Sequence, residues 1–221
     1  MRKLWILPLF LLITSAGLLM TACGSSSSTR VRLLNAFPST TTLDMLIAGK
    51  TVSSGVAYGA ASGYTSVSSG SQTLQVEPTG SSSPLFDETI NLASGSQSTI
   101  LATNTAATVF TDNNTSPSGG NFSVRAIDAS ASLGTTDVYV VLAGTDISTV
   151  SPTFSSVGFS SASGYQSLAP GSYEVIFTLP GQKFALITTS AMSFSAGQVR
   201  TVVALDGLTG GFSTAILSDL N

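Results

Sequence analysis

The stretch Ala61-Ser62-Gly63-Tyr64 recurs 101 residues later as Ala162-Ser163-Gly164-Tyr165. The pair Gly70-Ser71 recurs at the same spacing as Gly171-Ser172. Similar segments at a constant distance along a chain indicate a duplicated structural unit. The sequence therefore predicts two copies of one domain in tandem.

The matches extend outward from this stretch in both directions. Val31-Arg32 matches Val124-Arg125 at an offset of 93, and the segment 99–102 resembles 201–204 at an offset of 102. An offset that grows in steps is what loop insertions in the second copy produce while the strands stay aligned. We expect the copies to span residues 30–112 and 122–221, with the turn-forming segment 113–121 as a linker between them.

Short β-strands are the elements that the copies predict. Apolar and polar residues alternate at Leu74-Gln75-Val76-Glu77, whereas 138–142 is continuously apolar, which favours a central strand covered on both faces. Charged residues make up 9% of the chain, against about 25% in average proteins, so Ser, Thr and Gly supply most of the polarity. The predicted fold is all-β, with two tandem immunoglobulin-like β-sandwich domains.

The N-terminus resembles a bacterial lipoprotein signal. Arg2 and Lys3 precede an apolar run over 4–20, and the segment 19–24 reads Leu-Met-Thr-Ala-Cys-Gly. This resemblance to the lipobox implies that residues 1–22 are removed and that Cys23 accepts a diacylglycerol, with 23–29 as a tether. It implies an extracytoplasmic protein anchored in the bacterial cell envelope, at the outer membrane if the organism has one. The alternative is an ordinary signal peptide followed by a chance cysteine.

Several function classes receive no support from the composition. The chain has one cysteine and no histidine, so an internal disulfide and a Ser-His-Asp triad are impossible. The formal net charge is −3, and no basic patch for nucleic acid is visible. The segment Asp112-Asn113-Asn114 lacks the spacing of a calcium loop. We expect no enzyme activity, no cofactor, no metal and no nucleic-acid partner.

Two arginines and two aspartates recur in register. Arg32 is followed by Asp44, and Arg125 by Asp137, again at an offset of 93. An arginine and a carboxylate at matched positions predict a structural ion pair that joins the first two strands of each copy. The functional alternative is an ion pair that binds a ligand.

Two tyrosines, Tyr64 and Tyr165, follow the repeated Ser-Gly. Exposed tyrosines can stack on sugar rings, which makes this pair a candidate for ligand binding. The alternative is a ring that covers the core at the start of a strand, with its hydroxyl satisfied nearby.

With these segments in place, the chain resembles the bacterial family known as domain of unknown function 4397. The resemblance rests on Val31-Arg32, Asp44, Ser62-Gly63-Tyr64, and Gly95 before a threonine-rich strand, and the second copy carries these features again. The family implies an envelope-anchored sandwich module and no established activity. The leading hypothesis is therefore a non-catalytic, lipid-anchored protein with a structural or adhesive role.

A second hypothesis is a surface lipoprotein that binds polysaccharide or peptidoglycan. It predicts an exposed row of aromatic residues or a groove, expected between the two copies. The partners expected from the sequence are thus the membrane, through the N-terminal lipid, and an envelope polysaccharide or protein.

Overall fold

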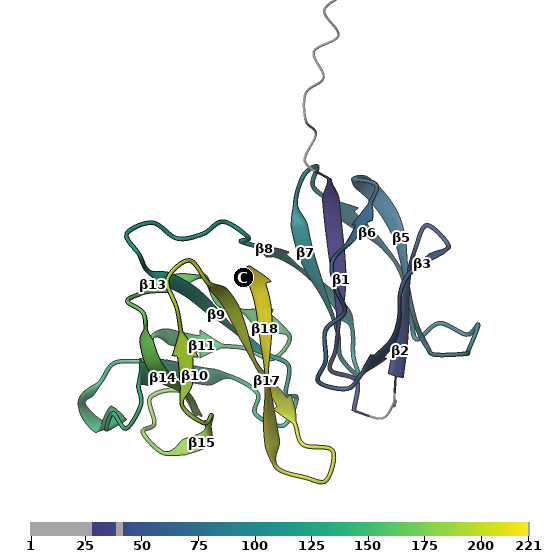
Figure 1. Cartoon of the computed structure of the whole chain (residues 1–221). Helices are drawn as coiled ribbons and strands as arrows, with labels where there is room; N and C mark the ends of the chain where they lie inside the picture. The colour runs from purple at the N-terminus through teal and green to yellow at the C-terminus, as the bar shows by residue number, and fades with distance from the viewer. Residues whose placement is uncertain (1–27, 39–41, 221) are drawn as a thin grey trace, which may run out of the picture.

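The computed structural model describes residues 28–38 and 42–220 (Figure 1). The predicted signal peptide and Cys23 lie outside the described residues. The described chain is built of β-strands, with a single 3-10 turn over Ile147–Thr149, which confirms the all-β prediction. None of its described segments forms a helix of the length and hydropathy needed to cross a bilayer.

Strands β1–β8 form the first repeat. One of its sheets has the order β4-β1-β7-β8 and the other has the order β3-β2-β5-β6. The strands are β1 (Thr29–Asn35), β2 (Thr42–Ile47), β3 (Lys50–Ala57), β4 (Thr65–Val67), β5 (Gly70–Pro78), β6 (Phe86–Leu92), β7 (Gln97–Ala102) and β8 (Ala107–Asp112).

Strands β9–β18 form the second repeat. One sheet has the order β12-β9-β17-β18, with β13 also paired to β9, and the other has the order β11-β10-β14-β15, with β16 also paired to β14. The strands are β9 (Phe122–Asp128), β10 (Thr136–Leu142), β11 (Phe154–Val157), β12 (Ser161–Ala162), β13 (Gln166–Leu168), β14 (Gly171–Thr178), β15 (Ala185–Thr188), β16 (Met192–Phe194), β17 (Val199–Asp206) and β18 (Phe212–Leu220).

Each repeat is a sandwich of two sheets around its own apolar core, as the sequence predicts. In both repeats the first strand pairs in parallel with the penultimate long strand, β1 with β7 and β9 with β17. The predicted linker 113–121 lies between β8 and β9. The division into two domains at these bounds stays a prediction.

The inner strand β1 is buried on both faces. Val31 and Leu33 pack into the core of the first repeat, whereas Leu34 and Ala36 belong to a different apolar cluster. Side chains alternate between the two faces of a strand, so the two sets point in opposite directions. The outward-facing set therefore has to be covered by something other than the first repeat.

The second repeat supplies this cover. The cluster shared by the repeats, called the inter-repeat cluster here, buries residues from β1, β7, β9, β17 and β18 and the residues that follow them. Figure 1 shows the sheets that carry β1 and β18 facing each other. Its buried members are Leu34, Ala36, Leu101, Ile127, Ala129, Val203, Leu205 and Leu217.

The continuously apolar strand 138–142 is also covered on both faces, but by residues of its own repeat. β10 lies between β11 and β14, which confirms its predicted central position. One face contributes Val138 and Val140 to the core of the second repeat. The other face, with Tyr139 and Val141, is covered by Ile147 from the long loop that follows the strand.

Candidate functional site

A buried arginine joins the first repeat to the end of the second. The guanidinium of Arg32, on β1, donates from Nε to the hydroxyl of Thr99 at 2.8 Å. Its Nη1 donates to the backbone oxygen of Ser218 at 3.0 Å, and its Nη2 donates to the carboxylate of Asp219. The side chains of Arg32 and Asp219 are 4% and 0% exposed. The Arg32 side chain thus makes one hydrogen bond within its own repeat and a charged one to the other repeat.

Arg125, on β9, makes the same set of contacts in the opposite direction. Its Nε donates to Thr201 within the second repeat at 2.9 Å. Its Nη1 donates to the backbone oxygen of Thr111 at 3.1 Å, and its Nη2 donates to Asp112 at the end of the first repeat. The two arginines therefore cross between the repeats, each to the last strand of the other.

Each carboxylate is also tied to its own repeat. Asp112 accepts hydrogen bonds from Thr99 at 2.7 Å and from Tyr64 at 2.6 Å. Equivalent bonds reach Asp219 from Thr201 at 2.6 Å and from the hydroxyl of Tyr165 at 2.7 Å. Eight side chains thus form one network with approximate twofold symmetry, which we call the crossed network: Arg32, Tyr64, Thr99, Asp112, Arg125, Tyr165, Thr201 and Asp219.

The predicted pairing of Arg32 with Asp44, and of Arg125 with Asp137, is wrong. The arginines bond directly to Asp219 and Asp112 of the opposite repeat, and Arg32 Nε also lies 4.0 Å from Asp112 in its own repeat. Asp112 and Asp219 occupy equivalent positions in the two copies, after Thr111 and Ser218. The sequence carried this signal, but the pairing crosses between repeats and could not be read from either copy alone.

The repeated aspartates have a separate, local task. Asp44 accepts a hydrogen bond from the backbone N–H of Gly55 at 2.7 Å, and Asp137 accepts one from Ser156 at 2.9 Å. Gly55 and Ser156 have positive φ values of 68° and 55°. The strand pairing shifts register beside both aspartates. Each carboxylate therefore fixes a bulge in the edge strand next to it.

Hydrogen bonds also set the ionisation of Asp44. Partial burial works to raise its pKa, but bonds from Thr79, Gly55 and Ser54 outweigh this effect and hold the pKa below its usual value of 3.8. Thr79 donates at 2.6 Å and Ser54 at 2.8 Å. The group is thus an ionised acceptor at neutral pH.

Both candidate tyrosines are half-buried members of the crossed network. The guanidinium carbon of Arg32 lies 4.6 Å from the ring centre of Tyr64, and that of Arg125 lies 4.8 Å from the ring centre of Tyr165. Burial is the main reason that the pKa of each hydroxyl is raised well above 10. With the hydroxyl bonded and one ring face against an arginine, these tyrosines have the arrangement that the structural alternative described.

The segment 112–114, which lacks the spacing of a calcium loop, takes part in the contacts between the repeats. Asp112 holds Arg125, and the side-chain nitrogen of Asn114 donates to the backbone oxygen of Asp219 at 2.5 Å. Within residues 28–38 and 42–220, His, Cys, Asp and Glu form no group of three or more that could hold a metal ion.

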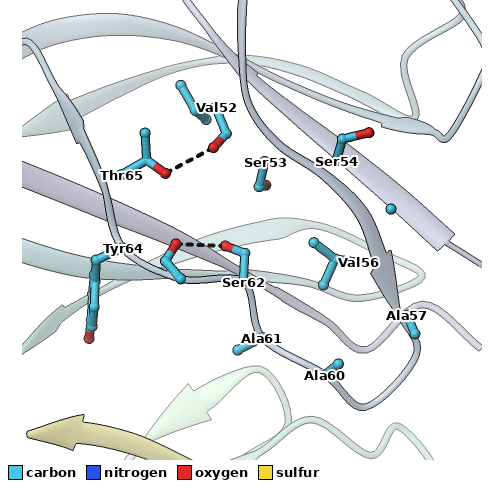
Figure 2. Close-up of a pocket in the computed structure, with 12 residues that line it drawn as sticks. Val52, Ser53, Ser54, Val56, Ala57, Ala60, Ala61, Ser62, Tyr64 and Thr65 are labelled. Carbon is cyan, nitrogen blue, oxygen red and sulfur yellow. Dashed lines mark hydrogen bonds between the residues drawn. The ribbon is translucent and has the colours of Figure 1, made fainter.

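An open groove of about 560 Å³ lies in the first repeat, between β3 and the segment 60–65. Figure 2 shows Ser53 between these two walls, with Thr65 and Val52 at one end. The hydroxyl of Thr65 donates to the backbone oxygen of Val52 at 3.0 Å and closes that end. Sequence reasoning did not identify this groove.

A second depression, of about 540 Å³, lies on the seam between the repeats. Its walls are Arg32 and 59–63 of the first repeat and 214–218 of the second. The segment 60–63 separates it from the first groove. A depression is therefore present between the repeats, where the polysaccharide hypothesis expected one.

Comparison with known proteins supports the family resemblance. A family model described as "Domain of unknown function (DUF4397)" matches residues 29–139. The chain belongs to this family. The DUF4397 match begins at β1 and ends inside β10, so it includes Arg32, Asp112 and Arg125. No curated protein matches the chain.

Two solved structures resemble this DUF4397 protein distantly. One is the C-terminal domain of AlgF from P. aeruginosa, with a TM-score of 0.31 and 14% identity over 45% of this chain and 99% of that one. Another is CBMbc (family CBM26) from Eubacterium rectale Amy13K in complex with maltoheptaose, with a TM-score of 0.30 and 11% identity over 85% of this chain and 96% of that one. Likeness at this level carries no functional argument.

Proposed function

We propose that this DUF4397 protein is a non-catalytic, lipid-anchored cell-envelope protein that presents its two β-sandwich repeats as one rigid unit. Its role is structural or adhesive. The observation that supports this proposal is the crossed network, in which each repeat buries an arginine against the last strand of the other.

Rigidity is the property that distinguishes this pair of repeats from domains on a flexible linker. Domains in one chain are expected to move relative to each other unless their interface is large and apolar. Here the inter-repeat cluster supplies the apolar part. The crossed network adds a geometric requirement, because moving the repeats apart would break two buried charge-assisted bonds, from Arg32 to Asp219 and from Arg125 to Asp112.

The non-catalytic part of the proposal rests on how the buried acids are used. The side chains of Asp112 and Asp219 are fully buried, and each accepts hydrogen bonds from a threonine, a tyrosine and an arginine. A carboxylate held in this way serves packing and orientation, and it has no open path to a substrate.

A polysaccharide- or peptidoglycan-binding lipoprotein is the second candidate function. The groove of the first repeat and the depression on the seam favour it, because both are open and lie side by side across 60–63. This binding role is compatible with a rigid adhesive protein and would give it a ligand.

The rigid unit can be tested with two spin labels. Ser83 and Ser190 are exposed and lie in different repeats, so both would be changed to Cys in a full-length Cys23→Ser chain purified in detergent. Double electron–electron resonance should give one narrow distance distribution. Adding Asp112→Asn and Asp219→Asn should broaden it. A distribution that is already broad without these two changes would refute the rigid unit.

A further inference from the structure

The two repeats differ at the groove in one informative position. Ser53 pairs with Met45 across β2 and β3, and Phe154 pairs with Val138 across β10 and β11. Because Met45 and Val138 are equivalent, Ser53 and Phe154 are equivalent too. The second repeat thus has a phenylalanine where the first has a serine.

The phenylalanine packs against the core of its repeat, together with the buried residues of β10 and β14. In the first repeat the small serine leaves this place open, and the groove of about 560 Å³ is found there. The groove therefore comes from a difference between two otherwise similar sequences. It is not a general property of the fold.

The Ser53 hydroxyl is buried without a partner. Its oxygen makes no hydrogen bond to the described residues, although it is shielded from solvent. A buried polar atom left without a partner costs about 1–3 kcal/mol, so such atoms are rare in folded proteins. Figure 2 shows this serine at the groove, where a rotation of its side chain would turn the shielded hydroxyl toward a bound molecule that supplies the missing bond.

The lining limits what that molecule can be. None of the twelve lining residues is charged, and they are Val, Ser, Gly, Ala, Thr and Tyr. The hydroxyls of Ser62 and Thr65 donate to the backbone oxygens of Gly63 and Val52, so they can offer acceptor lone pairs among the aliphatic groups of the lining. This mixture suits a neutral ligand that has hydroxyls on some sides and C–H groups on others.

The shape of the groove favours a compact ligand over an extended peptide. The Thr65–Val52 hydrogen bond closes one end, and a turn in which Ala60 donates to the backbone oxygen of Ala57 at 3.0 Å closes the other. A peptide that adds to a sheet edge needs an edge that is open along several residues. The volume falls within the roughly 300–1,000 Å³ that is usual for small-molecule sites.

We infer that the groove between β3 and 60–65 binds a neutral sugar unit of an envelope glycan, with the Ser53 hydroxyl as a buried hydrogen-bonding group. This inference rests on the proposed adhesive role and gives it a ligand class. It assigns the site to the first repeat alone, because Phe154 fills the equivalent place in the second.

The test uses full-length protein in detergent on an array of neutral hexose oligosaccharides, with acidic oligosaccharides and neutral peptides on the same array. Four proteins are compared: the wild type, Ser53→Phe, Ser53→Ala and Ser155→Phe. Ser53→Phe introduces the residue of the second repeat. Ser155→Phe is the control, because it adds the same ring to β11 at an exposed position.

The wild type should bind at least one neutral oligosaccharide. Ser53→Phe should weaken this binding at least tenfold, Ser53→Ala should weaken it several-fold, and Ser155→Phe should leave it unchanged. Ser53→Ala keeps the test valid if the larger change disturbs folding. Absence of neutral-sugar binding, equal binding by Ser53→Phe, or binding of peptides alone would overturn the inference. The spin-label distances do not depend on this result, so the rigid unit and the sugar site can fail separately.

Discussion

Arg32 and Asp219 are 187 residues apart in the chain and form a buried ion pair. Arg32 lies on the first strand of the described chain and Asp219 on the last. The matching pair, Arg125 and Asp112, is only 13 residues apart and spans the linker. The two pairs have the same chemistry, but only the first ties the ends of the described chain together.

Removing the charge of Asp219 should destabilise the protein strongly. Asp219→Asn keeps the size of the side chain but removes the carboxylate that the Arg32 guanidinium bonds directly, and leaves Asp112, 4.0 Å from Arg32 Nε, as its remaining counter-charge. Breaking a buried ion pair costs about 3–5 kcal/mol. We expect the free energy of unfolding, measured by urea denaturation, to fall by that amount.

Asp87→Asn is the matched control for this change. Asp87 is exposed on β6 and accepts a hydrogen bond from Gln75 at 3.1 Å. Surface contacts of this kind contribute about 0–1 kcal/mol. If Asp219→Asn were no more destabilising than Asp87→Asn, the crossed network would not hold the repeats together.

At the two bulges, replacing the glycine of one and introducing a glycine into the other should change the free energy of unfolding in opposite directions. Gly55→Ala should lower the free energy of unfolding by about 1 kcal/mol, because its φ of 68° is strained for residues with a side chain. No atom lies within 4 Å of the added Cβ, so the backbone alone decides the effect. Ser156→Gly should raise stability by about 0.5–1 kcal/mol. Thermal unfolding curves of both variants would check this, and equal signs for the two would contradict it.

The buried carboxyl of Asp128 should make stability depend on pH. Burial, with a smaller contribution from Asp206, raises its pKa to about 7, although bonds from Ser130 and Thr136 work in the other direction. The folded protein therefore prefers the protonated form. Its contribution to stability is complete below pH 4 and is lost as the pH rises through 7, by roughly 2–4 kcal/mol.

Asn35, the equivalent residue of the first repeat, suggests the variants that test this. Its side-chain nitrogen donates to the backbone oxygen of Val56 at 2.9 Å, a bond that a carboxylate cannot make. Asp128→Asn should flatten the dependence between pH 4 and pH 7 and be more stable than the wild type at pH 8. Asn35→Asp should add a second dependence of the same sign. Urea midpoints at five pH values would measure both, and an unchanged slope in Asp128→Asn would refute the assignment.

Lipid attachment is predicted for Cys23 and is tested in cells. Cys23→Ser should abolish incorporation of radioactive palmitate into the protein, because the thiol is the acceptor. A second variant, Cys23→Ser with Ser25→Cys, restores a thiol two residues later and should remain unlabelled. Label that persists in Cys23→Ser would remove the anchor from the proposed function.

Much of the fold could be predicted from the repeated segments, because strands and turns leave local patterns. Tyr64 and Tyr165 were candidates for ligand stacking with a structural alternative, and the arginines were predicted to be structural. All four side chains lie in the crossed network. The partners of the arginines were missed because Asp112 and Asp219 come from the opposite repeat. The β1 strand is buried on both faces although Arg32 and Asn35 interrupt its apolar residues, so its sequence does not say that a second domain covers its outer face.

The groove was not predicted either, and for a different reason. Ser53 and Phe154 are separated by the same 101 residues as the repeated Ser-Gly-Tyr, so their difference was visible in the aligned copies. A serine in place of a phenylalanine indicates a missing core side chain, but the position becomes a cavity only if neighbouring strands do not close over it. That outcome depends on packing and could not be read from the alignment.

The crossed arginines have a consequence for the origin of the protein. Each repeat gives one arginine to its neighbour and receives one in return, which is the reciprocity of a symmetric homodimer. A single-copy ancestor could have associated with itself through this same surface. Gene duplication and fusion would then have turned a concentration-dependent association into a permanent one, with a fixed one-to-one ratio and freedom for the two halves to diverge.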